Sequence, residues 1–237
     1  MAVCIKDCIQ NMNLVIGCTI GCSYCYARNN VRRFHMIDDF EKPEFFPNKL
    51  RLMEKKRPQN FLLTGMSDFS HWKPEWREQI FDKMPENPQH QYLFLTKRPE
   101  GIVFSTPLDN AWFGVTVTSS KEKDRIQTLR EHISGGHYYG TFEPMFDDIG
   151  PVDFTGIEWV VIGTETGRRG AALGADAAQR AGTLPSGALW PGKPHAGAAG
   201  LRLSGSHGGT QAAAHSAQGF GGERLRSSPC HFCLGSV

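Results

Sequence analysis

The sequence lacks the features that mark a membrane or secreted protein. Its 237 residues contain no apolar run of about 18 residues, so we expect no membrane span. The first residues, Met1 to Asp7, lack the apolar stretch of a secretory signal, and we therefore expect a cytoplasmic protein. With 40% apolar and 21% charged residues, the composition also excludes a wholly disordered or collagen-like chain.

The last part of the chain lacks the residues that build a core. From Gly170 to Val237 there is no Ile, Met or Tyr, and Gly and Ala together supply 28 of the 68 residues. Residues 1–167 carry 19 basic and 22 acidic side chains, a net charge of −3, whereas residues 168–237 carry 7 and 2, a net charge of +5. We therefore predict a folded body over 1–167 and a basic, low-complexity tail over 168–237 that is unstructured.

Three interpretations of this tail stay open. It is a basic arm that contacts nucleic acid, a flexible linker that ends in the pair Cys230 and Cys233, or the product of a reading-frame slip. We favour the slip, because helical and strand periodicity vanish together directly after a well-formed strand pattern. An intact alternative frame in the coding DNA would support it.

The body alternates between short apolar runs and helical patterns. Several runs are almost continuously apolar, which is typical of strands buried on both faces of a parallel sheet. A helix is expected from Pro74 through Ile80 to Met84, and another after the capping box formed by Ser119 and Glu122. Strands with helical crossovers predict an α/β fold whose parallel sheet curls into a partial barrel. The six expected strands are Asn13–Gly17, Asn60–Gly65, Gln91–Thr96, Ala111–Val117, His137–Phe142 and Ile157–Gly163.

Polar residues gather where the expected strands end. In parallel α/β sheets the ligand site lies at the carboxyl ends of the strands, so these residues predict a polar binding site. They are Thr64, Gly65, Ser67, Asp68, Lys97, Arg98, Thr116, Thr118, Glu143 and Glu165.

Three cysteines follow the first expected strand at the spacing Cys18-x3-Cys22-x2-Cys25. Three thiolates on one loop can bind three irons of a [4Fe–4S] cluster, which normally has four cysteine ligands. The missing ligand leaves one iron open to a small molecule. A structural zinc loop is the alternative, although zinc sites of that kind usually have four protein ligands.

This spacing, with Tyr24 before the last cysteine, resembles the signature of the radical SAM superfamily. The resemblance implies a partial (β/α)6 TIM-like barrel and a [4Fe–4S] cluster on Cys18, Cys22 and Cys25. It also implies S-adenosyl-L-methionine on the open iron, reductive cleavage to a 5′-deoxyadenosyl radical, and hydrogen abstraction from a substrate that the resemblance does not name. The electron donor implied is a flavodoxin or ferredoxin.

Further blocks of the body resemble the phage Gp37/Gp68-type radical SAM family, a relative of radical SAM mobile-pair proteins, over about residues 8–169. A partner radical SAM protein and a nucleic-acid substrate are compatible with that family. The blocks are Thr64–Asp68, Leu95–Arg98, Trp112–Thr116, Phe142–Pro144 and Trp159–Gly167. Beyond them the chain departs into the Gly/Ala-rich tail, which leaves a second hypothesis, an iron–sulfur-binding protein with an incomplete barrel and no turnover.

The resemblance implies cofactor contacts for eight residues and identifies no catalytic residue. The ring of Tyr24 would shield the cluster, and Lys97 would hold the carboxylate of S-adenosyl-L-methionine or an anionic substrate. Each residue also has a structural interpretation: packing, a helix cap, a salt bridge at the rim, a strand-forming side chain or a structural hydrogen bond. The eight residues are Tyr24, Thr64, Gly65, Ser67, Lys97, Thr116, Glu143 and Glu165.

We assign no function to the remaining candidate residues. A second metal site is not expected, because one of the two cysteine pairs that would have to form it lies in the tail. These pairs are Cys4 with Cys8 and Cys230 with Cys233. His71 is given no role. The basic runs Arg32–Arg33 and Lys55–Arg57 are interpreted as solvated helix surface rather than a nucleic-acid track, because the body is net acidic.

Overall fold

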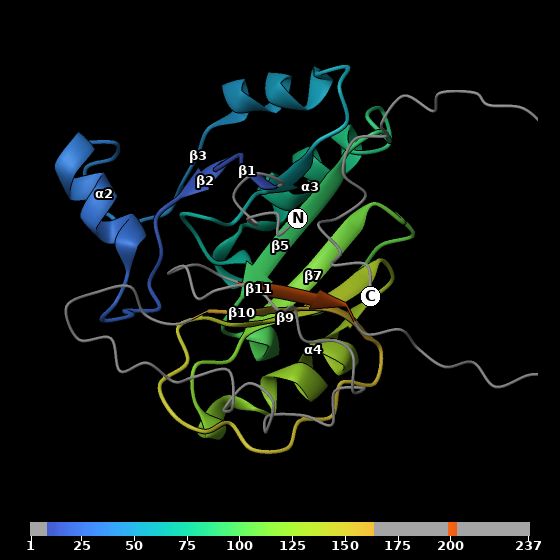
Figure 1. Ribbon diagram of the computed structural model, residues 1–237. Coiled ribbons are helices and arrows are strands. Elements are labelled where there is room, and N and C mark those ends of the chain that lie inside the picture. Colours follow the sequence, from blue (N-terminus) through green and yellow to red (C-terminus); the bar gives the residue numbers. More distant parts are fainter. Residues whose placement is uncertain (1–8, 164–198, 203–237) are drawn as a thin grey trace, which may run out of the picture.

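A computed structural model describes residues 9–163 and 199–202 of the chain (Figure 1). Its main sheet has the order β1-β4-β5-β7-β9-β10-β11, and the first six strands run parallel. The sheet curls into a half-barrel, which confirms the predicted α/β class. The strands are β1 (Ile9–Asn11), β4 (Asn60–Leu62), β5 (Gln91–Thr96), β7 (Ala111–Thr116), β9 (His137–Phe142), β10 (Ile157–Ile162) and β11 (Ala199–Arg202).

The first expected strand was placed wrongly. The segment that pairs with β4 is β1, whereas β2 (Val15–Ile16), within the expected strand, pairs antiparallel with β3 (Glu44–Phe45). Leu14, Val15 and Ile16 are almost fully buried, so the apolar run correctly indicated core. Burial alone does not specify which backbone an apolar segment pairs with, and the hydrogen-bonding partner was therefore not predictable.

One short strand lies inside the tail. β11 pairs antiparallel with the last parallel strand, with Trp159 opposite Arg202. The remainder of 168–237 lies outside the described residues, as do Cys4, Cys8, Cys230 and Cys233. The division into body and tail therefore stays a prediction.

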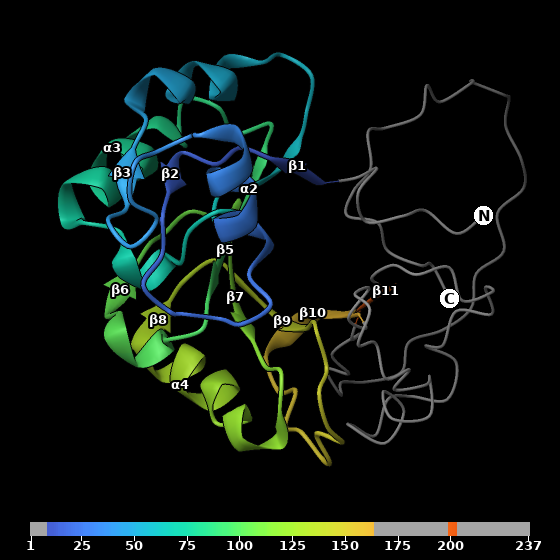
Figure 2. The same ribbon diagram turned by 90° about the vertical axis from the view of Figure 1, so that its left-hand side faces the viewer.

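Helices cover one face of the sheet. Figure 2 shows α3 (Pro74–Lys83) and α4 (Arg125–His132) on the same side of it, and Figure 1 shows that α2 (Tyr26–Phe34) stands apart from the sheet. Pro74 occupies the first turn of α3, as predicted, because its fixed φ suits that position. No helix in the described part of the chain is long and apolar enough to cross a bilayer. The short elements are η1 (Pro47–Glu54), η2 (Phe69–His71), η3 (Pro99–Gly101), η4 (Ser120–Glu122), β6 (Phe104–Ser105) and β8 (Ile133–Ser134).

The predicted capping box does not form. The Ser119 side chain makes no cap hydrogen bond, and α4 begins only at Arg125. Glu122 instead accepts hydrogen bonds from the amide and hydroxyl of Thr118, at 2.7 and 2.8 Å. The carboxylate thus binds the end of β7 rather than the start of a helix.

Two cores lie on opposite faces of the sheet. On the outer face the ring of Phe69 packs against Phe94 at 5.0 Å and against Phe113 at 5.8 Å, measured between centroids. The inner-face cluster is centred on Tyr139, whose hydroxyl donates to the carbonyl of Phe94 at 3.1 Å. Gly114 makes room for the Tyr139 ring, because a Cβ at that position would collide with it. The inner-face cluster consists of Leu93, Trp112, Tyr139, Trp159 and Val161.

We predict that Gly114→Ala lowers the free energy of unfolding by about 1–3 kcal/mol, since the added methyl group overpacks the space beside Tyr139. Gly140→Ala is the matched control, because its Cβ would lie an ordinary 3.5 Å from Phe142. Urea unfolding followed by circular dichroism measures both. Equal effects of the two substitutions would contradict the packing described here.

Candidate functional site

The backbone at Gly17 and Cys18 fixes the start of the cysteine loop, residues 18–25. Gly17 adopts a φ of 117°, and a Cβ there would lie 2.7 Å from the backbone of Pro43, so glycine is required at this turn. Its amide donates to the carbonyl of Met66 at 3.0 Å, and the amide of Cys18 donates to that of Phe40 at 2.7 Å. Cys18 is thereby held beside the carboxyl end of β4.

The third cysteine starts a helix. Cys25 is the N-cap of α2, and its Sγ accepts a hydrogen bond from the amide of Arg28 at 3.4 Å. The amide of Cys25 in turn donates to the carbonyl of Cys22 at 3.3 Å. The N-terminal end of the helix therefore points at this sulfur.

The three sulfurs are close enough to influence one another. Burial raises the pKa of Cys18 to about 11; the Ile20 amide opposes this rise, and the charges of Asp68, Cys22 and Cys25 add to it. All three cysteines are free and half-buried. Three sulfurs on one short loop are suited to a bound cation, which would neutralise the repulsion between their thiolates.

The donor chemistry of the three cysteines can be set against that of a single metal ion and of a cluster. Among the described residues, no three His, Cys, Asp or Glu side chains lie close enough together to hold one metal ion. Sulfurs around a single zinc ion lie about 3.8 Å apart, as follows from a Zn–S distance of about 2.3 Å. In a [4Fe–4S] cluster each thiolate binds its own iron, so the sulfurs are further apart. Thiolates are the ligands that such a cluster takes, and Cys18, Cys22 and Cys25 are the residues that would hold it.

Tyr24 joins the cysteine loop to the strand ends. Its ring packs edge-on against Phe146 with centroids 5.2 Å apart, and Lys97 Nζ lies 5.7 Å from its centroid. The Tyr24 hydroxyl interacts with the side chains of Thr118 and Cys22, and burial, followed by the charge of Cys22, raises its pKa. The ring thus lies between the second cysteine and the ends of β5 and β7.

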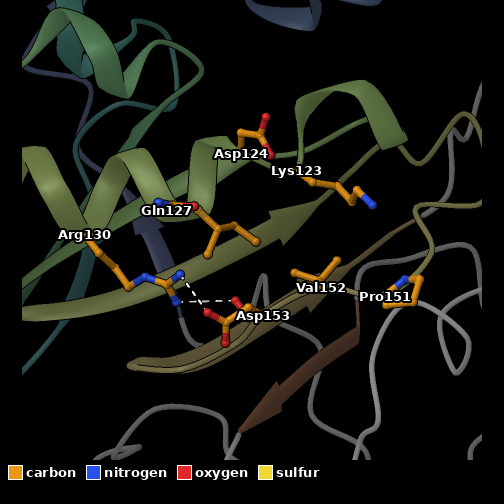
Figure 3. Close-up of a pocket in the computed structure, with 8 residues that line it drawn as sticks. Lys123, Asp124, Gln127, Arg130, Pro151, Val152 and Asp153 are labelled. Carbon is orange, nitrogen blue, oxygen red and sulfur yellow. Dashed lines mark hydrogen bonds and ion pairs between the residues drawn. The ribbon is translucent and has the colours of Figure 1, made fainter.

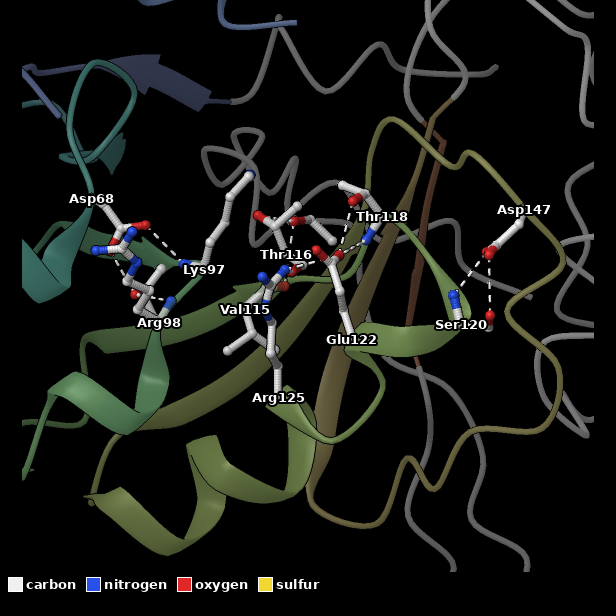
Figure 4. A network of polar contacts seen from close by, with 12 residues as sticks. Asp68, Lys97, Arg98, Val115, Thr116, Thr118, Ser120, Glu122, Arg125 and Asp147 are labelled. Carbon is white, nitrogen blue, oxygen red and sulfur yellow. Dashed lines mark hydrogen bonds and ion pairs between the residues drawn. The ribbon is translucent and has the colours of Figure 1, made fainter. Parts of the chain in front are cut away.

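Asp68 organises the ends of β4 and β5 (Figure 4). Its Oδ1 accepts from the Thr96 hydroxyl at 2.6 Å and from the amide and hydroxyl of Ser70 at 3.0 and 2.7 Å. Its Oδ2 accepts from the amide of Lys97 at 2.8 Å. Asp68 therefore caps η2 and fixes the end of β5 through four donors, three on Oδ1 and one on Oδ2.

Lys97 brings a partly desolvated cation to the site. Burial lowers its pKa, the negative charges of Cys22 and Asp68 oppose that shift, and the nearby Arg125 adds to it. In Figure 4 its side chain extends away from the Asp68 carboxylate that binds its backbone. Its ammonium group is placed to meet an anion beside Tyr24.

A second network lies at the end of β7. The Thr116 hydroxyl accepts from that of Thr141 at 2.9 Å, and the Thr116 carbonyl accepts from Arg125 at 2.7 Å. Arg125 also pairs with Glu122 at 2.9 Å. Although burial raises the pKa of Glu122, the Thr118 hydrogen bonds and the Arg125 charge outweigh it and lower the pKa. No pattern in the sequence pointed to Arg125, and Glu122 was expected only as part of a capping box.

The residues after β4 are engaged within the protein. The Thr64 hydroxyl accepts from the amide of Leu95 at 2.8 Å, and the Ser67 hydroxyl accepts from the Trp72 indole at 2.9 Å. The Gly65 carbonyl accepts from the Tyr26 hydroxyl. Both hydroxyl groups keep their own protons and can still donate, so their predicted role toward a cofactor stays a prediction.

The structure describes one of the two carboxylates predicted to bind the cofactor. Glu143 is exposed at the end of β9, and a Cβ at Gly163 would lie 2.7 Å from its carboxyl carbon. The glycine therefore permits this side chain to lie across the end of β10. Glu165 lies outside the described residues.

His71 was given no role from the sequence, yet it touches the cysteine loop. Its Nε2 lies 2.9 Å from the hydroxyl of Thr19, the residue after Cys18. Its Nδ1 is buried without a hydrogen-bond partner, and burial lowers its pKa. The contact spans 52 residues along the chain, so no local motif could have indicated it.

A cavity of about 220 Å³ lies on the flank of α4, away from this site (Figure 3). Arg130 crosses it to pair with Asp153 at 2.9 Å. The cavity shares no residue with the cysteine loop or with the two polar networks. It is lined by Lys123, Asp124, Ile126, Gln127, Arg130, Pro151, Val152 and Asp153.

We predict that Asp68→Asn lowers the free energy of unfolding by about 2–3 kcal/mol, because the new amide group would face the backbone N–H of Lys97 or the other donors. Asp39→Asn is the matched control, since Asp39 is a half-exposed carboxylate that accepts one backbone amide at 2.9 Å and pairs with Lys42 at the surface at 3.0 Å. Chemical denaturation measures both variants. If Asp68→Asn unfolds like the control, the four-donor arrangement is wrong.

Comparisons with known proteins give a family and a distant fold likeness. The family model described as a protein of unknown function, DUF5131, matches residues 3–179. No curated protein matches the chain. Two structures of spore photoproduct lyase mutants with dinucleoside spore photoproduct, one also with bound AdoMet, align at 11% identity with TM-scores of 0.41 and 0.40. Each alignment covers 56% of this chain and 45% of the other.

Proposed function

This chain belongs to the DUF5131 family, and we propose that it is a radical SAM enzyme of the phage Gp37/Gp68 type. A [4Fe–4S] cluster on Cys18, Cys22 and Cys25 would, when bound, supply reductive cleavage of S-adenosyl-L-methionine to a 5′-deoxyadenosyl radical that abstracts a substrate hydrogen. The proposal covers the reaction type and leaves the substrate open.

One observation carries the proposal. Three cysteines at the spacing of the radical SAM signature lie on a single loop that leaves the sheet beside the carboxyl end of β4. Parallel α/β sheets bind their ligands at this edge. The charges of Cys22 and Cys25 contribute to the raised pKa of Cys18, which supports a site at which the three sulfurs act together.

We assign the surrounding residues separate roles in binding the cofactors. Lys97 offers a cation to the carboxylate of S-adenosyl-L-methionine, and the ring of Tyr24, packed beside Phe146, keeps water from the second cysteine. The amino group of S-adenosyl-L-methionine would be bound by Thr64, Gly65 and Ser67. Its ribose would be bound by Thr116 and Glu143. Glu165 is assigned the same role by its sequence position alone.

Anaerobic reconstitution with iron and sulfide tests this function. We predict uptake of about four irons per chain and, after reduction, formation of 5′-deoxyadenosine from S-adenosyl-L-methionine. Replacing any one of Cys18, Cys22 or Cys25 by Ala should abolish product, because each supplies one of only three protein ligands. Cys4→Ala with Cys8→Ala is the matched control and should leave both measurements unchanged.

The alternative outcomes are distinct. A cluster that forms without cleavage of S-adenosyl-L-methionine would select the non-catalytic iron–sulfur protein. About one zinc per chain, with no iron or sulfide, would select the structural zinc loop and overturn the proposal.

A further inference from the structure

The first cysteine lies between two contacts with the segment that follows β4. Before it in the chain, the amide of Gly17 donates to the carbonyl of Met66 at 3.0 Å. After it, the hydroxyl of Thr19 lies 2.9 Å from Nε2 of His71. Cys18 is therefore attached to this segment from both sides, by the backbone on one side and by a pair of side chains on the other.

The cysteine loop has few other attachments beyond Cys18. Thr19 and Gly21 are exposed, and a Cβ at Gly21 would meet no atom within 4 Å. Among the described residues, the contact of Thr19 with His71 is the one hydrogen bond that joins residues 19–23 to the protein outside the loop. The position of this part of the loop therefore depends on His71.

His71 is itself held on a fixed element. It is the last residue of η2, which Asp68 caps by accepting the amide of Ser70 at 3.0 Å. The amide of His71 donates to the carbonyl of Asp68, also at 3.0 Å. The next residue, Trp72, is 2% exposed and donates from its indole to the Ser67 hydroxyl at 2.9 Å. The imidazole thus offers the loop a rigid point of attachment.

The ring of His71 is not the most stable side chain for its surroundings. Its Nδ1 is buried and has no hydrogen-bond partner in the described part of the chain. A buried polar atom without a partner lowers stability, and an apolar ring of similar size would avoid that cost. What the histidine adds, and an apolar ring would not, is the contact with Thr19.

This contact also bears on the sulfur of Cys18. The amide of Ile20, the residue directly after Thr19, donates to Cys18 Sγ at 3.5 Å. A side chain that fixes Thr19 therefore also holds the Ile20 amide beside the sulfur. Hydrogen bonds to the cysteine sulfurs help to set the reduction potential of iron–sulfur clusters.

We propose that His71 is a positioning residue for the metal-binding loop, and that it acts through Thr19 to hold the Cys18 sulfur and the Ile20 amide in place for a [4Fe–4S] cluster. The inference rests on the proposed function and adds to it a residue outside the cysteine motif. His71 is not itself a ligand in this arrangement, because its Nε2 is engaged with the Thr19 hydroxyl.

Anaerobic transfer of iron from the reconstituted protein to the chelator bathophenanthroline disulfonate tests this role. We expect His71→Phe to lose iron about fivefold faster, which is the effect of one hydrogen bond. Its reduction potential should become more negative, because the Ile20 amide is no longer held at the sulfur. Its thermal stability before reconstitution should not fall, since phenylalanine keeps a ring and removes the unpaired nitrogen. His71→Gln, whose amide reaches the position of Nε2, should restore the slow loss of iron.

Two further variants identify the contact. Thr19→Val removes the hydroxyl and should match His71→Phe, and the double variant should be no faster than either, because both changes remove one interaction. His132→Phe is the matched control. His132 is a half-buried histidine at the end of α4 whose Nδ1 lies 3.2 Å from the Ile102 carbonyl, and its replacement should leave the loss of iron unchanged.

Hydrogen exchange of residues 18–25 in the full chain before reconstitution separates failure of this inference from failure of the proposed function. We expect His71→Phe to speed exchange at the Ile20 amide about fivefold, again the effect of one hydrogen bond. If the unsubstituted protein takes up no iron and sulfide, the proposed function fails, while exchange still tests the attachment. If the cluster forms and His71→Phe loses iron as slowly as His132→Phe, the positioning role is wrong. Fast loss of iron from His71→Gln would also overturn it, since the hydrogen bond would not be the cause.

Discussion

Parallel pairing of the strands is the constraint from which the site arises. Because β1, β4, β5, β7, β9 and β10 all run in one direction, their carboxyl ends meet at one edge. Side chains that are far apart in the sequence, such as Asp68 and Thr96, come together there. The cysteine loop is attached to the same edge through Gly17, whose backbone bridges to Ser67. A sheet with mixed directions would separate the loop from the polar residues that surround it.

The charges at this edge are balanced in pairs. Asp68 is satisfied by four donors, and Glu122 by Thr118 and Arg125, so neither carboxylate is left buried without partners. Lys97 is different, since it lies over an aromatic ring and shares its surroundings with the Cys22 thiol. A sulfur ligand group and a desolvated ammonium group on either side of Tyr24 form a polar site suited to a charged small molecule.

Local patterns in the sequence predicted what depends on neighbours in the chain. Five of the six parallel strands and the Pro74 start of α3 were anticipated, because continuous apolar runs and helix-start residues act locally. The pairing of β1 was not, since the buried run at Val15 is compatible with more than one partner strand. The contact of His71 with Thr19 and that of Arg125 with Thr116 depend on the tertiary fold, so no spacing rule could reveal them. The spacing of Cys18, Cys22 and Cys25 was readable because it is itself a local pattern.

The most direct measurement is electron paramagnetic resonance of the anaerobically reduced protein, with and without S-adenosyl-L-methionine. We expect the signal of a reduced [4Fe–4S] cluster whose line shape changes when the nucleotide is added, since one iron has no protein ligand. A signal that does not respond to the nucleotide would contradict an open iron. No iron–sulfur signal from protein with Cys18, Cys22 and Cys25 intact would contradict the account as a whole.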